Sequence, residues 1–390
     1  MIELICQQGL WLALGIQGLV LVLFAWRWHG LRHDQRQWPK EPEDAWPDLE
    51  VILCLRGADS ALPALLASLA AQAYTGCWHL NLVVDSEEDP AWGLVDPWLN
   101  TSQTGWTTIR RERLHQRPAQ GSLKCAALRQ ACSGLMPTTK LVVLLDADAT
   151  LAPDGLQRLA RACWRPGVGA VSGNRWYAPD GWGLLAWTRA VWGAAALVLM
   201  TLLEIPWGGN LALRRELVDG GGWIELLERG LCEDTGLLKP LQQLGMRYEV
   251  RPELLVLERS GPETWGELYH WISRQILNTR LHHPAGVLVL FYGLGTMLIL
   301  VLIGVAVLNG IWWVALGYEL GCWILLLFLQ RVVIGRWCQS RQAMGWLLGV
   351  LPGQVINSAT TVGAWLQRKV AWRGVTYRVT HHPAGVRLIT

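Results

Sequence analysis

The sequence LVVLLDAD, residues 141–148, runs from a stretch of apolar residues directly into two aspartates, Asp146 and Asp148. A short, continuous apolar run predicts a buried strand of a parallel sheet. Carboxylates that follow such a strand lie at the edge of the sheet where α/β folds bind ligands. Their hard oxygen atoms suit Mg²⁺ or Mn²⁺, which would offset the charge of a diphosphate. Taken alone, such a pair more often caps a helix or charges a turn.

The sequence around this stretch alternates short β-type runs with helical stretches, from about residue 47 to residue 258. The pattern predicts βαβ units around a mostly parallel sheet. Residues 184–205 are apolar enough for a membrane span, but they contain Arg189 and lie inside this domain, so we expect a buried or interfacial helix. The expected strands are 49–55, 80–85, 107–110, 141–146 and 170–176, and the expected helices are 62–72, 122–132 and 154–163.

Composition places another part of the chain in a membrane. Of its 390 residues, 52% are hydrophobic and only 17% are charged, which exceeds the apolarity of an ordinary globular domain. Residues 10–28 form a first run that is long enough to cross a bilayer. This run is uncharged until Arg27, near its end, and the basic residues Arg32, Arg36 and Lys40 follow. The positive-inside rule therefore predicts an integral membrane protein with its N-terminus outside and its α/β domain facing the cytoplasm.

The apolar character returns in the last third of the chain. Residues 285–308 and 310–330 are expected to form a transmembrane hairpin. Residues 343–366 are interrupted by Pro352-Gly353 and followed by basic residues, so we expect a re-entrant or interfacial hairpin there. The resulting division is an anchor at 1–30, a linker at 31–47, the α/β domain at 48–262, an interfacial helix at 263–284, the transmembrane hairpin at 285–330, and a basic loop, re-entrant or interfacial segment and cytosolic tail at 331–390.

The net charge bears on whether the protein binds nucleic acid, and the cysteines bear on its cellular compartment. The formal net charge is +3 and the sequence has no block of Lys and Arg interleaved with aromatic residues, so a nucleic acid is not expected as a partner. The nine cysteines are scattered without Cys-x-x-Cys pairs. Such spacing is typical of reduced thiols in the cytosol.

Two more acidic segments are candidates for the same site as Asp146. Asp85 stands at the end of an apolar strand in VDSEEDPA, residues 84–91, which places it at the same sheet edge as Asp146. Asp85 is therefore a candidate for a contact to the base or ribose of a nucleotide. Glu233 and Asp234 follow Gly-rich turns, and a carboxylate there is a candidate base for an acceptor hydroxyl. Each site has a plainer interpretation, a solvated acidic turn for the first and helix N-terminal charges for the second.

The order of these features is more specific than any one of them. It resembles the inverting glycosyltransferases of the GT-A (nucleotide-diphospho-sugar transferase) fold, and within them ceramide glucosyltransferase and its bacterial relatives. The resemblance covers about residues 48–284 and the arrangement of the anchors. In chain order the features are Asp85, Lys124 within GSLKCAAL (121–128), Asp146 with Asp148, GGNLALRR (208–215), and Glu233 with Asp234.

The resemblance implies a role for each site residue. Asp85 would contact the nucleotide. Asp146 and Asp148 would contact the diphosphate and a divalent cation, Mn²⁺ or Mg²⁺. Asp234 would be the general base. Lys124 would bind phosphate, although an exposed helix charge explains it about as well. The implied donor is a UDP-sugar, and the implied acceptor is a membrane lipid, ceramide-like or other. Inversion needs one in-line displacement, so a single base suffices.

The sequence departs from the family at one motif. These families carry a Gln/Arg-x-x-Arg-Trp segment on an interfacial helix, and here it becomes WISRQ, residues 271–275, in which only Arg274 survives. A guanidinium at Arg274 still suits diphosphate oxygens, whereas Trp271 and Gln275 alter the surroundings of the acceptor. Further on, WRGVTYR, residues 372–378, resembles a C-terminal segment of membrane glycosyltransferases that approaches the active site. A basic interfacial tail is the alternative for this segment.

Two other functions compete with transfer of one sugar to a lipid. A processive polysaccharide synthase of the cellulose or hyaluronan type needs a polymer tunnel, for which the predicted spans are few. A catalytically silent membrane scaffold would have no use for carboxylates that face one another across a cleft.

Overall fold

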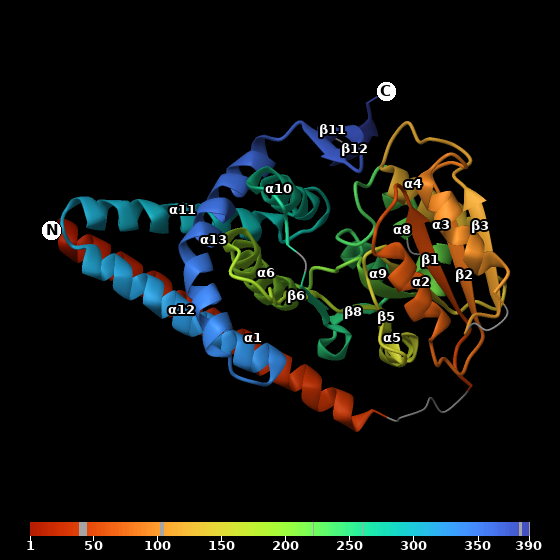
Figure 1. Cartoon of the computed structure of the whole chain (residues 1–390), viewed down its shortest axis with the longest axis horizontal. Coiled ribbons are helices and arrows are strands. Elements are labelled where there is room, and N and C mark those ends of the chain that lie inside the picture. Colours follow the sequence, from red (N-terminus) through yellow and green to blue (C-terminus); the bar gives the residue numbers. More distant parts are fainter. Residues whose placement is uncertain (39–44, 102–104, 221, 260, 382–383, 390) are drawn as a thin grey trace.

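The computed structural model describes residues 1–38, 45–101, 105–220, 222–259, 261–381 and 384–389. An α/β domain lies at one end of the molecule and a group of long helices at the other (Figure 1). The α/β domain holds a seven-stranded sheet in the order β3-β2-β1-β4-β7-β5-β8. Its strands are β1 (Leu49–Leu55), β2 (Trp78–Val84), β3 (Thr108–Arg113), β4 (Leu141–Leu145), β5 (Val168–Ser172), β7 (Asn210–Arg214) and β8 (Arg247–Val250).

The sheet is mostly parallel, as the sequence predicts, with one exception. Strand β7 pairs antiparallel with β4 on one side and with β5 on the other. The sequence analysis did not predict this strand, and only its first residue, Asn210, belongs to the Gly-rich turn expected at residues 208–210. The expected strand at 170–176 is in fact β5 followed by a separate short strand, β6 (Arg175–Tyr177), which pairs with β9 (Val256–Glu258). The carboxyl ends of β1, β2 and β4 share one edge because these strands are parallel neighbours.

Helices cover both faces of the sheet, and alternate residues of the strands explain the two layers of core. Val51 and Leu53 of β1 pack with α2 and α5, whereas Ile52 packs with the layer that contains α4, as the period of a strand requires. The Ser122 hydroxyl accepts a hydrogen bond from the Cys125 amide and thereby caps α4. The helices are α2 (Leu62–Ala70), α3 (Pro90–Leu99), α4 (Leu123–Ser133), α5 (Gly155–Cys163), α7 (Arg215–Gly220), α8 (Trp223–Leu227), α9 (Leu238–Gln243) and the 3₁₀ turn η1 (Pro252–Leu254).

Four helices in the described part of the chain are long and apolar enough to cross a membrane: α1 (Ile2–Gln37), α6 (Leu184–Leu203), α11 (Gly286–Leu308) and α12 (Trp312–Ile334). Helices α1 and α12 run side by side, and Gln17 donates a hydrogen bond to the Tyr318 hydroxyl at 2.8 Å. The N-terminus and the turn between α11 and α12 lie at the end of the molecule farthest from the sheet (Figure 1). Half of the apolar window of α6 is buried within the protein.

The hairpin expected at residues 343–366 is wrong, because this segment is part of one unbroken helix, α13 (Ser340–Leu366), with Pro352 inside it. The physical reason is close packing against α6. Gly345, Gly349 and Gly353 recur at every fourth position of α13, and a Cβ at these positions would clash with Trp187 or Val191 of α6. Small residues at this spacing let two helix backbones approach, and this packing compensates for the helix hydrogen bond that a proline lacks.

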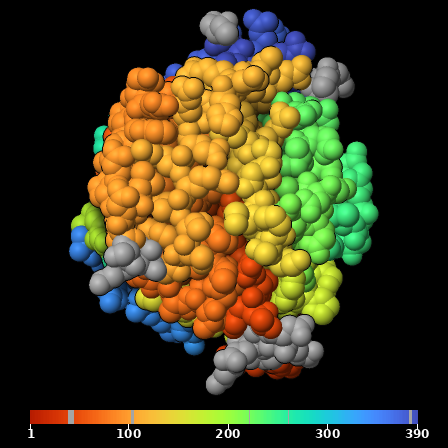
Figure 2. All heavy atoms as spheres, turned by 90° about the vertical axis from the view of Figure 1, so that its right-hand side faces the viewer, coloured from red at the N-terminus to blue at the C-terminus, as the bar shows by residue number. Residues whose placement is uncertain are grey.

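The C-terminal tail folds into a three-stranded antiparallel sheet of β10 (Lys369–Trp372), β11 (Val375–His381) and β12 (Ala384–Leu388). This sheet packs on α10 (Trp265–His282), the helix expected at 263–284, in one buried apolar cluster. Figure 2 shows the face of the α/β domain that points away from the long helices, with the C-terminal segment along one rim. The tail is therefore part of the folded protein.

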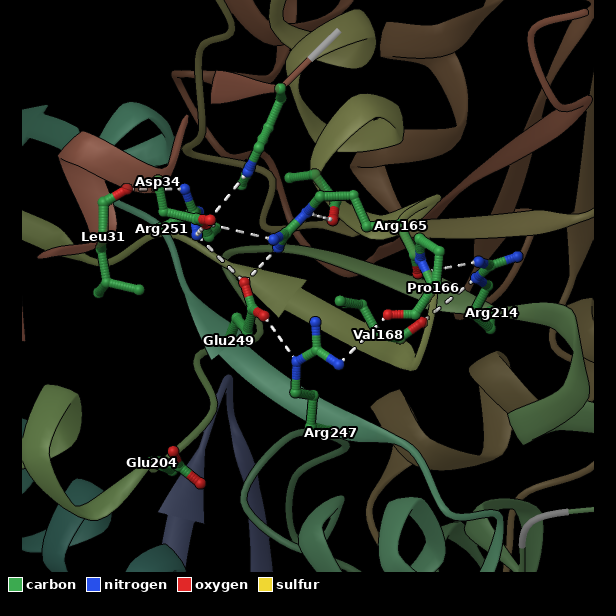
Figure 3. A network of polar contacts seen from close by, with 12 residues as sticks. Leu31, Asp34, Arg165, Pro166, Val168, Glu204, Arg214, Arg247, Glu249 and Arg251 are labelled. Carbon is green, nitrogen blue, oxygen red and sulfur yellow. Dashed lines mark hydrogen bonds and ion pairs between the residues drawn. The ribbon is translucent and has the colours of Figure 1, made fainter. Parts of the chain in front are cut away.

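A network of charges around the buried Arg251, the anchor network, joins the end of α1 to the α/β domain (Figure 3). Arg251 is fully buried and forms ion pairs with Asp34 at 3.3 Å, Glu249 at 3.1 Å and Glu253 at 2.9 Å. Its guanidinium also donates to the Leu31 carbonyl at 3.1 Å. Since Leu31 and Asp34 belong to α1, this network fixes the first anchor helix relative to β8.

Candidate active site

A cavity of about 450 Å³ opens at the carboxyl edge of the sheet. It collects every site residue that the sequence predicts, from elements far apart in the chain. Asp85 follows β2, Asp146 and Asp148 follow β4, and Lys124 lies in the first turn of α4. Asp234 comes from the loop between α8 and α9, and Arg274 comes from α10.

Lys124 is the central cation of this cavity. Its ammonium group lies 2.9 Å from Asp146 Oδ1 and 2.6 Å from Glu233 Oε1. Burial alone would lower the pKa of Lys124, but the two carboxylates outweigh it and hold this pKa well above the usual value. Burial likewise acts to raise the pKa of Asp146, and Lys124 and Arg175 together lower it instead. Lys124 is therefore a fixed positive charge within the cavity, not an exposed helix charge.

Arg175, which the sequence analysis missed, pairs with the second aspartate of the motif. Its guanidinium lies 2.7 Å from Asp148 Oδ1 and 3.6 Å from Asp146 Oδ2, and it stacks over the Trp207 ring at 5.2 Å. Arg175 comes from β6, a short strand that pairs with a strand far along the chain. The local sequence therefore gave no signal that this residue belongs to the site.

Asp234 is held by backbone amides. The Gly208 amide donates to Asp234 Oδ2 at 2.7 Å, and the Thr235 amide donates to Oδ1 at 2.6 Å. A Cβ on Gly208 would lie 2.1 Å from Glu233 Oε1, so only glycine lets the backbone approach both acids. These bonds orient the carboxylate toward the cavity that it lines.

Glu233 belongs to an acidic site that the sequence analysis named, but the resemblance implied a role for Asp234 alone. Its side chain is 3% exposed. Burial raises its pKa to about 7, with Lys124 opposing this shift and Asp234 adding to it. Its position next to Asp234 in the sequence was the available signal, but two adjacent acids at the start of a helix usually lie in solvent.

Asp85 sits between two arginines. It forms an ion pair with Arg56, and a second with Arg117 at 2.9 Å. Its neighbour Asp89 has a structural role, because it caps α3 through the Ala91 amide. Arg56 follows β1 and lines the same cavity, which adds a cation that the sequence analysis did not single out.

One face of α10 borders the cavity. Trp271, Arg274, Gln275 and Asn278 line it together, at the spacing of successive turns of a helix. The Arg274 guanidinium lies 5.2 Å from the centre of the Trp372 ring, which belongs to the C-terminal sheet. The residues that replace the family motif thus occupy the wall of the cavity.

The turn between β10 and β11 closes one side of the cavity. Arg373 adopts a left-handed backbone conformation, with φ 48°, and Gly374 follows with φ 74°. The Arg373 side chain forms an ion pair with Asp59 at 2.6 Å, while its carbonyl accepts a hydrogen bond from Arg56 at 2.9 Å. The C-terminal segment therefore reaches the candidate active site and is not a free interfacial tail.

A smaller pocket of about 110 Å³ shares part of its wall with the cavity. We call it the side pocket. Seven residues line both spaces: Arg175, Tyr177, Trp207, Asp234, Trp271, Gln275 and Asn278. The rest of its wall is mostly apolar and comes largely from the long helices: Trp192, Gly193, Ala195, Ala196, Leu199 and Met200 of α6, Val289 and Tyr292 of α11, and Asn357 of α13.

The residues at the sheet edge fit a metal that arrives with a diphosphate. Asp146 and Asp148 provide carboxylate oxygens of the kind that Mg²⁺ and Mn²⁺ bind. Buried carboxylate oxygens of Asp85 and Glu233 have no hydrogen-bond partner. No group of three or more His, Cys, Asp and Glu that could hold a metal occurs among the described residues. The protein would therefore supply two carboxylates, and phosphate oxygens and water would complete the coordination.

Comparison with solved structures defines the class of fold. The mannosyltransferase PcManGT from Pyrobaculum calidifontis, solved with GDP-Man and Mn²⁺, is similar over 94% of this chain and 99% of its own, with a TM-score of 0.50 and 18% sequence identity. The α/β domain therefore has the GT-A fold, as the sequence predicts, with long apolar helices on both sides of it in the chain.

The family follows from the sequence match. The model of glycosyl transferase family 21 matches residues 14–384, and the chain belongs to this family. Proteins named N-acetylglucosaminyltransferase from Mesorhizobium japonicum and from Rhizobium sp. (strain N33) are each 30% identical over 134 residues, which is 34% of this chain. This chain spans less than a third of their length, 29% and 27% respectively.

Proposed function

We propose that this protein transfers a single sugar, a hexose from a UDP-sugar, to the hydroxyl group of a membrane lipid, with inversion at the anomeric carbon. One observation carries this proposal. The charged cavity at the sheet edge and the apolar side pocket meet at Asp234. A nucleotide-sugar suits the first space, an apolar acceptor suits the second, and the candidate base lies where they join.

The chemistry needs one displacement. The lipid hydroxyl attacks the anomeric carbon, its proton passes to Asp234, and the bond to the diphosphate breaks, so that the nucleoside diphosphate leaves with the bonding electrons. The cations Lys124, Arg175 and Arg274 line this cavity and would stabilise the charge of the leaving group. A divalent cation on Asp146 and Asp148 would add Lewis-acid stabilisation when it is bound. Asp85 would contact the nucleotide.

The position of the helices supports a membrane acceptor. The side pocket is walled by α6 and α11, two of the helices that are apolar and long enough to cross a membrane. The basic residues after the first anchor favour an α/β domain in the cytoplasm, where nucleotide-sugars are made. A lipid hydroxyl would then approach from the bilayer and a donor from the cytoplasm.

The proposal is tested by transfer of radiolabel from a panel of UDP- and GDP-sugars, including UDP-glucose, UDP-N-acetylglucosamine and GDP-mannose. Purified full-length protein in detergent receives Mn²⁺ and a total lipid extract. We expect label from one donor in the organic-extractable fraction. Label only in an insoluble polymer would favour a polysaccharide synthase, and no transfer from any donor would contradict the proposal. The variant Asp146→Asn serves as the negative control, because asparagine has the shape of aspartate but lacks the charge of a proposed metal ligand.

A further inference from the structure

Three exposed arginines gather where α12 ends and α13 begins. Arg331 lies in the last turn of α12, Arg336 in the loop that follows, and Arg341 in the first turn of α13. The Gln330 side chain donates a hydrogen bond to the Gln342 side chain at 3.4 Å, so the segments that carry Arg331 and Arg341 lie side by side. We call the three arginines the basic patch.

The protein does not neutralise the charges of the basic patch. Among the residues that the structure describes, none of these arginines forms an ion pair with a carboxylate. Arg331 donates to a backbone carbonyl of the loop, and the Arg341 guanidinium lies 5.7 Å from the centre of the Trp182 ring. Asp180, two residues before that tryptophan, already pairs with Arg259 at 2.7 Å. The three positive charges are therefore accessible to an anionic ligand.

Exposed tryptophans stand beside the basic patch. The side chain of Trp337, in the same loop, is 62% exposed, and that of Trp182 is 53% exposed. Tryptophans are enriched at the level where the acyl chains of a bilayer meet the headgroups. A second exposed pair, Trp312 and Trp313, begins α12 at its other end. The two groups of tryptophans therefore mark two levels along one helix.

The length of α12 fits a bilayer between these levels. Its 23 residues rise by about 35 Å, and the hydrocarbon core of a bilayer is about 30 Å thick. The turn between α11 and α12 lies at the end of the molecule farthest from the sheet (Figure 1). The other end of α12, with the basic patch, therefore lies at the bilayer surface that is nearer to the α/β domain.

We propose that the basic patch binds the headgroups of anionic phospholipids in this leaflet. Guanidinium groups form paired hydrogen bonds with phosphate oxygens, and the rings of Trp182 and Trp337 pack at the boundary below the headgroups. The charge alone would also suit a nucleic acid or an acidic protein. The exposed tryptophans, one bilayer thickness from the pair at the start of α12, favour a lipid. This binding is separate from the proposed sugar transfer and does not depend on it.

The experiment compares two phospholipids that differ in headgroup charge. Phosphatidylglycerol, which is anionic, and phosphatidylcholine, which is zwitterionic, are given equal acyl chains. Each is titrated into full-length protein in a non-ionic detergent, and native mass spectrometry measures the bound fraction. Each arginine near an anionic headgroup contributes about fivefold to binding. We therefore expect the Kd of the wild-type protein for phosphatidylglycerol to be at least about tenfold below its Kd for phosphatidylcholine.

A triple variant then tests the basic patch. It combines Arg331→Gln, Arg336→Gln and Arg341→Gln, which keep polar side chains of similar length and remove the three charges. The ratio of the two Kd values is expected to fall to about one, because only the charge-assisted contacts distinguish the two headgroups. The ratio is internal to each protein, so a lower yield of folded variant does not affect it.

A second triple variant is the matched control. It combines Arg113→Gln, Arg158→Gln and Arg247→Gln, three exposed arginines of the α/β domain, and so has the same net charge as the first. This variant should keep the wild-type ratio. A wild type without preference, or a patch variant that retains the preference, would overturn the inference. An equal loss in the control would also overturn it, because net charge and not the basic patch would then decide binding.

Discussion

Two networks of buried charge in this protein have similar chemistry and different surroundings. The anchor network also includes Arg165, which forms ion pairs with Asp34 and Glu249, and it joins α1 to the α/β domain (Figure 3). The guanidinium groups of Arg165 and Arg251 lie over the Trp38 ring at 3.8 Å and 4.1 Å. The second, the cavity network, consists of Lys124, Asp146, Asp148, Arg175 and Glu233, which all line a space large enough for a ligand.

The difference shows how to separate structural from functional charges. In the anchor network, each hydrogen-bonding nitrogen of Arg251 has a partner within the protein. In the cavity network, Glu233 Oε2 and Arg175 Nε are buried without one. Glu253 Oε2 of the anchor network is also buried without a partner. The difference therefore lies in the surroundings, because Glu233 and Arg175 line a space that a ligand can fill.

The largest expected effect on activity comes from the base. Asp234→Asn keeps an oxygen for one of the two backbone amides that bind Asp234 but cannot take a proton. The kcat should therefore fall by roughly 10²–10⁴-fold, while the dissociation constant of the nucleotide-sugar stays unchanged. Single-turnover transfer and calorimetric binding of the donor measure the two quantities. The exposed Asp219 on α7, which pairs with Arg215, provides the control Asp219→Asn. An equal loss of donor binding and transfer would remove Asp234 from this role.

The anchor network should show the opposite response. Arg251→Met leaves the buried carboxylate of Glu253 without its cation, which should lower the free energy of unfolding by about 3–5 kcal/mol. The protein that remains folded should keep its KM for the donor. The control Arg247→Met removes a more exposed partner of Glu249 and should cost less than about 1 kcal/mol. Thermal unfolding in detergent distinguishes the two variants, and a similar melting temperature for both would contradict a structural role for Arg251.

The effect of a chelator tests whether the cavity network binds a metal ion. A chelator should lower the rate of transfer at least about a hundredfold, and Mn²⁺ or Mg²⁺ should restore it. The reason is that a metal ion stabilises the charge that develops on such a leaving group by several kcal/mol. The melting temperature of the nucleotide-free protein should not change with chelator, since Lys124 and Arg175 already neutralise the aspartates. Full activity in the chelator would refute the assignment of Asp146 and Asp148 as metal ligands.

The smallest expected effect concerns the pH dependence of stability. Burial raises the pKa of Glu233 to about 7 from a usual value of 4.5, so the native state keeps a proton that the unfolded chain releases. The contribution of this group to the free energy of unfolding should therefore fall between about pH 4.5 and pH 7, by at most about 3 kcal/mol, and stay constant above. Glu233→Gln should remove that component from the melting curves. Identical curves for the two proteins would show that Glu233 stays ionised.

The sequence predicts the parts of this site that follow strands. Asp85 and Asp146 come directly after apolar runs, so their shared edge follows from parallel pairing. Strand β7 was missed because its five residues follow glycines and pair only with distant strands. Arg175 was missed for a similar reason. Asn278, in contrast, lies seven residues after Trp271, a spacing that already places both on one helix face.

The helix α13 shows another limit of sequence patterns. Pro352 and Gly353 are local signals for a break, and they predict a hairpin when read alone. The repeat of glycines at 345, 349 and 353 is the competing signal, and its meaning depends on a partner helix that the pattern does not identify. Contact with Trp187 and Val191 of α6 decides the outcome.

The most direct test of the account is the structure of the reaction product. Full-length protein, one UDP-α-hexose and a lipid with a primary hydroxyl are incubated, and the extracted product is analysed by mass spectrometry and by the proton coupling of its anomeric centre. The account predicts one hexose per lipid in the β configuration, as a single displacement assisted by Asp234 requires. An α-linked product or a chain of several sugars would contradict it.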